Sequence, residues 1–436
     1  MREKSYLTRR QTLSAVATGA SVSVAGCNGS SSDRTDGLAF DHPDTVLADE
    51  AFDITVEGLP SNERVDVVLT SEDGDGESFE GRATVETGDG TVSLADATVV
   101  SESDDPLDGV VDADVDVPLP LALFQFAYPL QLRTYSAPDK HEFTYRIERD
   151  GEPVGTTTLT RTYPDFDGYI DLDHPELEGA LYEPADGEAA PGVIVLHGSV
   201  ARLYLPPAAR LAARGYNVLT LQYFGTEELP DELNGVPIEY VRDAATWLRD
   251  RESTTGEQIG LFGASKGGEL ALLAGSQFDA FGPVVSVNGS GLVWEGLTAD
   301  NYPESGTSTW TLDGEPVPYL DGEHMYDGPD GAGEEEVEAA SIPVEDIDGP
   351  VVLVSGGADE LWPSAELQGP AADRLDEYGH PNYEHLIYED AGHFIPPRYT
   401  PTVGLIAEGG TYAGAAEASH DHWGAVLDAF SSLRDH

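Results

Sequence analysis

A turn framed by two glycines constrains this chain more than any other segment. The turn, Gly263-Ala264-Ser265-Lys266-Gly267, separates a short apolar run at 258–262, typical of a strand, from a helix-forming run at 269–274. Small residues two positions before and two after the serine avoid a clash where a strand bends sharply into a helix, and the serine takes strained backbone angles. The segment therefore predicts a strand–turn–helix unit that presents Ser265 at its tip.

This glycine–serine pattern is weak by itself, because a chain with 48 glycines has many glycine-rich turns. An ordinary turn is the alternative, and it would be favoured if no acid and no histidine followed later strands. However, Asp359 follows a β-branched run at 351–355, and His393 follows a second strand-like run at 385–388. The order Ser, Asp, His, each after a strand, is that of the catalytic residues in α/β hydrolases.

These three residue types together can perform nucleophilic catalysis. A serine hydroxyl is a poor nucleophile at neutral pH, so a base must accept its proton during attack and return it to the leaving group. We assign this role to His393, while Asp359 holds the imidazole tautomer and stabilises the imidazolium. Most of the other ten histidines and of the 81 acidic residues are interpreted as surface or turn positions.

The same chemistry needs donors for the oxyanion. We predict the backbone N–H of Lys266 as one donor, and Ser199 or Val200, in the loop after a strand at 193–196, as the other. Each such donor typically contributes about 3 kcal/mol to transition-state stabilisation. Lys266 is one of three lysines in the chain, and we expect it to place a positive charge beside the nucleophile.

Other histidines could suggest different chemistry. His197 precedes the predicted oxyanion loop, where a structural or substrate-facing role is favoured over base chemistry. His420 and His422 resemble a metal cluster, but residues two apart do not share a helix face, and the only cysteine lies at position 27. We predict neither a metal site nor a cofactor.

From about residue 45 to its C-terminus, the chain resembles the acyl-CoA thioesterase and bile acid-CoA:amino acid N-acyltransferase family. The matching segments are 222–225 with 228–230, the elbow at 263–270, Ser286-Val287-Asn288-Gly289-Ser290, 391–397 and a final helix from Trp423. The resemblance implies Ser265 as nucleophile, Asp359 as acid and His393 as base. The oxyanion loop departs from the family's glycine-rich pattern, which leaves the choice of donors there open.

The resemblance implies a β-sandwich followed by a hydrolase domain, and the sequence patterns support the same division. Strand-like runs at 52–56, 65–69 and 143–147 are separated by turns rich in Gly, Asp and Asn. Strands alternate with helical patterns, such as 206–214 and 238–251, from about residue 175. We predict an α/β fold class: an immunoglobulin-like all-β sandwich at 40–165 followed by an α/β-hydrolase catalytic domain at 170–436.

The resemblance implies cleavage of a fatty acyl thioester. In this family the N-acyltransferase branch carries cysteine at the nucleophile position, so Ser265 favours hydrolysis. A carboxylesterase and an acyl-CoA:amino acid N-acyltransferase are the alternative enzymes. A catalytically silent surface lipoprotein is an alternative from another class, and the presence of all three catalytic residue types counts against it.

Charge restricts the environment and the partners. The chain carries 22 basic and 81 acidic residues, a formal net charge of −59 spread along its length. Molar salt screens such repulsion over roughly 3 Å, so we predict a halophilic protein. Nucleic acid is excluded as a partner, since no basic segment offers a footprint.

The first 36 residues are predicted to be a targeting segment and linker. Arg9-Arg10 lie in a twin-arginine pattern, and Val24-Ala25-Gly26-Cys27 resembles a lipobox in which Cys27 carries the lipid. We therefore expect export by the twin-arginine route and anchoring to the outer face of the membrane through Cys27. Two further segments have open alternatives: 119–132 packs between domains or contacts an acyl chain, and 298–340 is a lid or a structureless insertion.

Overall fold

The structure is a computed structural model that describes most of the chain from residue 30 to residue 434. Within that range it leaves out residues 36, 75, 101–116, 130–139, 163–169, 173, 175, 185–186, 299–302, 304, 326–327 and 403–407. The predicted twin-arginine signal and the lipid attachment residue Cys27 lie outside the described residues.

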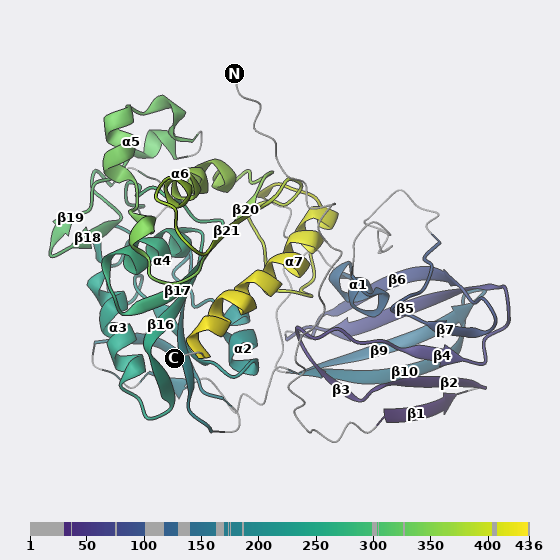
Figure 1. Ribbon diagram of the computed structural model, residues 1–436. Coiled ribbons are helices and arrows are strands. Elements are labelled where there is room, and N and C mark those ends of the chain that lie inside the picture. Colours follow the sequence, from purple (N-terminus) through teal and green to yellow (C-terminus); the bar gives the residue numbers. More distant parts are fainter. Residues whose placement is uncertain are drawn as a thin grey trace.

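The N-terminal part of the chain forms two β-sheets (Figure 1). The smaller sheet has the order β1 (Ser30–Thr35), β2 (Leu38–Pro43), β4 (Thr55–Glu57) and β7 (Thr91–Ser93). The larger has the order β3 (Thr45–Leu47), β10 (Glu152–Thr162), β9 (Lys140–Arg149), β5 (Arg64–Glu72), β6 (Ser78–Glu86) and β8 (Tyr128–Pro129). Phe40 and Val56 of one sheet share a hydrophobic cluster with Val67 and Phe143 of the other, so one core stabilises both.

Strand β4 is shorter than the predicted run at 52–56. The carboxylate of Asp53 accepts the backbone N–H groups of Ile54 at 2.7 Å and Ala95 at 2.8 Å. The Asp53 carboxylate thus binds backbone N–H groups where β4 begins, while the Ile54 carbonyl still accepts the N–H of Leu94 at 3.0 Å.

The rest of the chain is built around an eight-stranded mixed sheet. Its order is β11 (Ile170–Asp171), β12 (Glu178–Tyr182), β14 (Asn217–Gln222), β13 (Ala190–Leu196), β16 (Thr254–Ala264), β17 (Phe281–Val287), β20 (Val351–Gly356) and β21 (Tyr383–Tyr388). The strands from β14 to β21 pair in parallel, and β12 is antiparallel to β14. This arrangement confirms the predicted α/β class.

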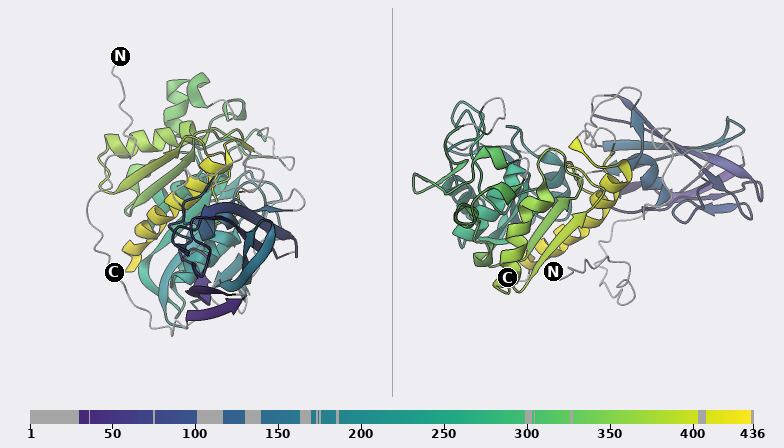
Figure 2. Two further views of the ribbon diagram at one scale, coloured as in Figure 1. Left: turned by 90° about the vertical axis from the view of Figure 1, so that its right-hand side faces the viewer. Right: turned by 90° about the horizontal axis from the view of Figure 1, so that it is seen from above.

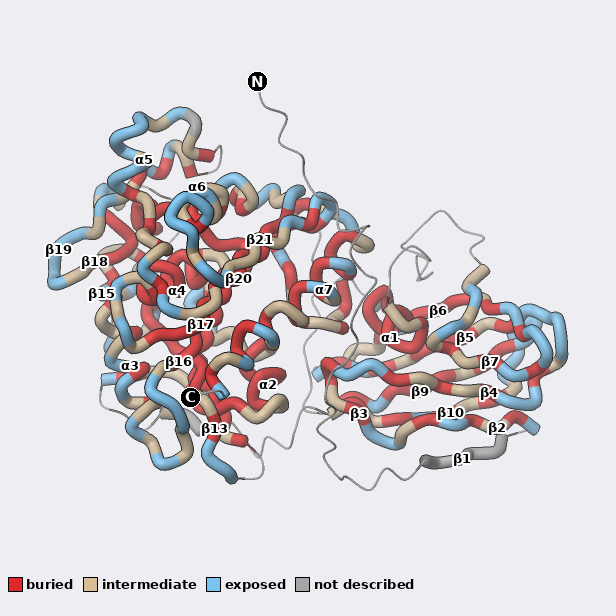
Figure 3. Tube along the Cα trace, viewed as in Figure 1, coloured by how far each residue is buried: buried red, intermediate tan, exposed pale blue. Residues whose placement is uncertain are grey.

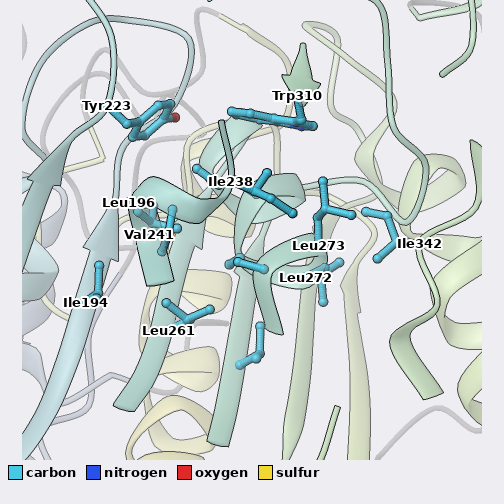
Figure 4. Packing of buried hydrophobic residues seen from close by; sticks show 14 of the residues in the cluster. Ile194, Leu196, Tyr223, Ile238, Val241, Leu261, Leu272, Leu273, Trp310 and Ile342 are labelled. Atoms are coloured by element: carbon cyan, nitrogen blue, oxygen red, sulfur yellow. The ribbon is translucent and has the colours of Figure 1, made fainter. Parts of the chain in front are cut away.

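Helices cover both faces of this sheet because its strands are apolar on both sides. Ile194 and Leu261 pack with α3 (Glu239–Arg249), α4 (Lys266–Gln277) and α6 (Ser364–Glu377). Val195 and Phe262 face the opposite way and pack with α2 (Leu205–Ala213) and α7 (Tyr412–Ser431). Figure 4 shows the first of these clusters, and the buried central strands are red in Figure 3. Two-sided burial is expected of parallel strands.

The described part of 298–340 is folded, so this segment is not a structureless insertion. It contains β18 (Trp310–Leu312), β19 (Glu315–Pro316), two 3₁₀ turns (Gly322–His324 and Pro329–Gly331) and α5 (Glu334–Ala340). β18 pairs with β15 (Val236–Pro237). Trp310 and Leu320 are buried in the cluster that contains Leu270 and Leu273 of α4, so the segment is anchored to the helix that follows Ser265.

The two parts of the chain meet at α7 and a short helix, α1 (Leu119–Gln125), as the views in Figures 1 and 2 agree. The Gln125 amide donates to Ala416 O at 3.2 Å, and Thr402 N donates to Gln125 O at 2.9 Å. The buried Asp49 accepts from Arg214 at 2.9 Å and from the Trp423 indole at 3.0 Å. The α1 segment thus packs between the two parts, the first of its predicted alternatives.

Helix α7 begins well before the predicted start at Trp423. Thr411 caps it by accepting the N–H of Gly414 at 3.0 Å. The chain's described helices and turns also include 3₁₀ turns at Val344–Asp346 and Ser432–Arg434. No helix among the described residues has both the length and the apolar character needed to cross a bilayer.

Candidate active site

Ser265 lies at a sharp turn between the end of β16 and the start of α4. Its backbone has φ 55° and ψ −125°, a conformation that costs of order 1–3 kcal/mol for a non-glycine residue. A Cβ added to Gly263 would lie 1.9 Å from Gly267 O, and one added to Gly267 would lie 2.3 Å from His197 O. The flanking glycines are therefore required by close backbone contacts, as the sequence pattern predicts.

Asp359 and His393 lie after the next strands in the sheet. Asp359 Oδ2 and His393 Nδ1 are 2.8 Å apart, and the two side chains are 0% and 5% exposed. Asp359 Oδ1 accepts the backbone N–H groups of Leu361 at 3.0 Å and Trp362 at 3.1 Å. If the imidazole donates from Nδ1 to this fixed carboxylate, its Nε2 keeps the lone pair that a base needs.

The parallel strands bring these loops to one edge of the sheet. β16, β17, β20 and β21 are successive neighbours, and their carboxyl ends carry Ser265, Asn288, Asp359 and His393 respectively. Among the hydrogen bonds of the described residues, one joins Asp359 to His393 and none joins Ser265 to His393. Catalytic hydrogen bonds commonly tighten only when substrate binds, so the lack of this bond does not exclude His393 as the base for Ser265.

The predicted oxyanion donors border Ser265. Lys266 is the first residue of α4, so its N–H has no partner within the helix and lies at the positive end of the helix dipole. A Cβ added to Gly198 would lie 3.2 Å from the Ser265 Cβ, which brings the 198–200 loop against the serine. Ser199 is half-buried and Val200 is 65% exposed. Gly198 and Lys266 thus flank the nucleophile, and the choice between Ser199 and Val200 as the second donor stays a prediction.

His197 has a structural position. Its ring is buried and stacks on Tyr223, with centroids 4.2 Å apart and an interplanar angle of 9°. The Tyr223 hydroxyl donates to the His197 carbonyl. Burial lowers the pKa of His197 to about 4, so the ring is neutral at pH 7. This environment agrees with the predicted preference for a structural role.

The side chain of Lys266, predicted to place a positive charge beside the nucleophile, is buried in an ion pair that was not predicted. Its ammonium is buried, 2.9 Å from Glu269 Oε2 and 3.0 Å from Thr309 Oγ1. Burial lowers the pKa of Lys266 and raises the pKa of Glu269, while their mutual attraction opposes both shifts. The positive charge therefore does not face a substrate: it is neutralised within the protein.

Glu269 has a structural role that was not predicted from the sequence. Its side chain is fully buried, and Oε1 accepts the Trp310 indole at 2.8 Å and Trp294 N at 3.3 Å. It therefore joins the elbow helix to the 292–320 segment. The available signal was a Lys and a Glu three positions apart on a predicted helix, the spacing of a side-chain pair.

Three exposed apolar side chains lie in the loops that carry the candidate site residues. Of the five large hydrophobic residues that are exposed in the described part of the chain, three lie in its loops. Val200 is 65% exposed, Leu361 two residues after Asp359 is 38% exposed, and Phe394 next to His393 is 43% exposed. We call these three residues the apolar rim.

The histidines of α7 do not form a metal site. His422 is buried, with Nδ1 2.6 Å from Ala418 O. Across the residues that the structure describes, no group of three or more His, Cys, Asp or Glu side chains is arranged to hold a metal ion.

Comparisons with known proteins find similarity to thioester hydrolases. Residues 236–432 match the family model described as "BAAT / Acyl-CoA thioester hydrolase C terminal". Acyl-coenzyme A thioesterase 1 of Rattus norvegicus is 30% identical over 264 residues, which cover 59% of this chain and 62% of that protein. Mitochondrial acyl-coenzyme A thioesterase 2 of Mus musculus is 29% identical over 264 residues, which cover 59% of this chain and 57% of that protein.

The chain spans less than two thirds of the length of these two relatives. Among solved structures, a putative dienelactone hydrolase from Klebsiella pneumoniae matches 61% of this chain and 97% of its own, with 15% identity and a TM-score of 0.41.

Proposed function

We propose that this chain is a serine hydrolase of the acyl-CoA thioesterase/BAAT type that cleaves a fatty acyl thioester through an acyl-enzyme on Ser265, and the match of residues 236–432 to the C-terminal model of that family supports the proposal. One observation carries the proposal: the buried Asp359–His393 pair, at 2.8 Å, lies at the same sheet edge as the strained serine. A strained backbone of this kind is concentrated at functional sites, and a buried Asp–His pair at the same edge can act as base and orienting acid for a serine.

The proposed reaction has two steps. The Ser265 oxygen attacks the thioester carbonyl as His393 Nε2 takes the hydroxyl proton; the carbon–sulfur bond then breaks and the thiolate leaves with that proton. A water molecule, deprotonated by His393, next attacks the acyl-enzyme and releases the acid with Ser265 restored. Asp359 stabilises the imidazolium in both steps. The N–H of Lys266, with that of Ser199 or Val200, binds the oxyanion.

The apolar rim supports an acyl substrate. Val200 lies on the oxyanion side of Ser265, whereas Leu361 and Phe394 lie beside the acid and the base. An acyl chain that leaves the reacting carbonyl would therefore meet apolar surface, and each buried CH₂ contributes about 0.8 kcal/mol. Serine at the nucleophile position favours water over an amine as acceptor.

A hydrolysis screen in molar salt tests the proposal. Wild type is assayed with acyl-CoA and with p-nitrophenyl acyl esters, and Ser265 is labelled with a fluorophosphonate. We expect thioester hydrolysis and labelling, both lost in Ser265→Ala and both kept in Ser276→Ala, whose hydroxyl bonds Leu273 O on the same helix. Equal labelling of wild type and Ser265→Ala would refute the nucleophile assignment, and turnover of esters alone would identify a carboxylesterase.

We propose further that an immunoglobulin-like sandwich at 40–165 precedes the catalytic domain at 170–436, and that the 1–36 segment exports a halophilic protein and anchors it through a lipid on Cys27. The shared core of the two N-terminal sheets supports the first proposal. For the second, Cys27→Ala should move the protein from the membrane fraction to the medium; unchanged fractionation would contradict it.

A further inference from the structure

Asn288 lies at the carboxyl end of β17, between the strands that carry the nucleophile and the acid. Its side chain is buried, with 1% of the residue exposed, and its φ is 48°. Asparagine tolerates this left-handed conformation better than most residues. The preceding residue, Val287, accepts the N–H of Ser265 at 2.8 Å, so Asn288 follows directly the segment that holds the nucleophile.

The side-chain oxygen of Asn288 holds the acid loop. Oδ1 accepts the N–H of Gly356 at 2.8 Å and the hydroxyl of Ser364 at 3.1 Å. These two residues lie on either side of Asp359 in the sequence. The Asn288 carbonyl also accepts the Trp362 indole at 2.8 Å, and the Trp362 backbone N–H donates to Asp359 Oδ1 at 3.1 Å.

The side-chain nitrogen of Asn288 holds the histidine loop. Nδ2 donates to the carbonyl of His393 and, at 3.5 Å, to that of Gly392. One amide therefore bonds the acid loop through its acceptor and the histidine loop through its donor. Among uncharged side chains of this length, only an amide offers both groups.

We propose that Asn288 is a positioning residue for the reaction, which holds Asp359 and His393 at the correct positions relative to Ser265. The inference rests on the proposed function but concerns a residue that touches neither substrate nor reacting atoms. A displacement of about 1 Å at a reacting group can cost on the order of 10²-fold in rate. Loss of the amide should therefore lower kcat, while KM, which depends on substrate contacts, changes little.

Asn288→Gly is the sharpest variant, since glycine accepts the positive φ and removes only the side chain. Asn217→Ala is the matched control. Asn217 is also a buried asparagine, and its amide donates to Ser253 at 3.1 Å and Thr254 at 2.7 Å. It begins β14, so it lies at the amino ends of the parallel strands, whereas the candidate site lies at their carboxyl ends.

The experiment measures urea unfolding, kcat, KM and the rate of fluorophosphonate labelling of Ser265. We expect both variants to be destabilised, and only Asn288→Gly to lose about 10²-fold in kcat and in labelling rate. If Asn288→Gly does not fold, Asn288→Ser, whose hydroxyl can still accept from Gly356, takes its place with an intermediate loss expected.

Different results would overturn the positioning role of Asn288 and the proposed function of the protein. A folded Asn288→Gly with kcat and labelling within twofold of wild type would overturn the positioning role, as would an equal loss in Asn217→Ala. Wild type that neither hydrolyses any acyl substrate nor reacts with the probe would instead overturn the proposed function.

Discussion

Removing the charge of Glu269 should lower the free energy of unfolding, because it leaves the buried ammonium of Lys266, next to the nucleophile in the sequence, without its counter-charge. Glu269→Gln keeps the shape of the side chain and an oxygen for the Trp310 indole, but it leaves the Lys266 ammonium with Thr309 as its polar partner. The Lys266 and Glu269 side chains are 2% and 0% exposed, so water cannot replace the lost carboxylate. Breaking a buried pair in this way typically costs 3–5 kcal/mol.

Deprotonation of Lys266 sets an upper limit on this cost. Neutralising a lysine of ordinary pKa 10.5 at pH 7 costs roughly 5 kcal/mol, at about 1.36 kcal/mol per pH unit. In the variant, burial without a counter-charge lowers the pKa of Lys266 further. The unfolded state then binds one more proton than the folded state, and the variant gains about 1.36 kcal/mol of stability relative to wild type per unit rise in pH.

Urea unfolding at pH 7 and pH 9 in molar KCl measures both effects. We expect Glu269→Gln to lose about 3–5 kcal/mol at pH 7, with a smaller deficit at pH 9. The control is Glu183→Gln, since Glu183 pairs with Arg251 at 3.1 Å with about a third of each side chain exposed; its loss should stay within about 1 kcal/mol. A loss below 1 kcal/mol for Glu269→Gln, or a deficit that does not shrink at pH 9, would refute the reasoning.

Four further changes, three substitutions and a fall in pH, should alter turnover or stability in predictable directions. Asp359→Asn should lower kcat by roughly 10⁴-fold with folding intact, and unchanged turnover would remove Asp359 from the mechanism. Gly267→Ala should lower the free energy of unfolding by more than about 2 kcal/mol, because its Cβ would lie 2.3 Å from a backbone oxygen; an unchanged urea midpoint would contradict this. Phe394→Ser should reduce kcat/KM for long acyl chains more than for acetyl substrates, whereas an equal loss at every length would exclude the apolar rim from chain binding. Burial lowers the pKa values of His197, His385 and His422 to about 4 from 6.5, so the stability that these neutral rings contribute above pH 6.5 should be lost as the pH falls toward 4; urea midpoints that do not change over this range would contradict it.

Much of the candidate site could be predicted from the sequence because its determinants are local. Gly263 is required by a contact with Gly267 inside the turn, and apolar runs mark the strands that precede Asp359 and His393. Gly267 is required by the backbone of His197 at the end of the neighbouring strand, but the sharp strand-to-helix turn by itself already predicts a small residue there. Strand type, chain order and a sharp turn are properties of short segments. The α/β class follows from the same alternation, and the edge at which the loops meet follows from parallel pairing.

The boundaries were less predictable where a side chain competes with the backbone. Asp53 accepts two backbone N–H groups just before the observed start of β4, and Thr411 starts α7 well before Trp423. Both effects depend on a single hydrogen bond or two, which the hydrophobic pattern of the neighbouring residues does not encode.

The sequence by itself thus determined the elbow, the order of the proposed catalytic residues and the fold class, because these depend on backbone sterics and on periodicity. Only the tertiary structure decided what the neighbours of Ser265 do. Lys266 could have faced a substrate, but packing buries it against Glu269, whose carboxylate also binds the distant Trp310. Asn288 bridges two loops far along the chain. Such partners are chosen when strands and helices pack, since most buried polar groups must find one.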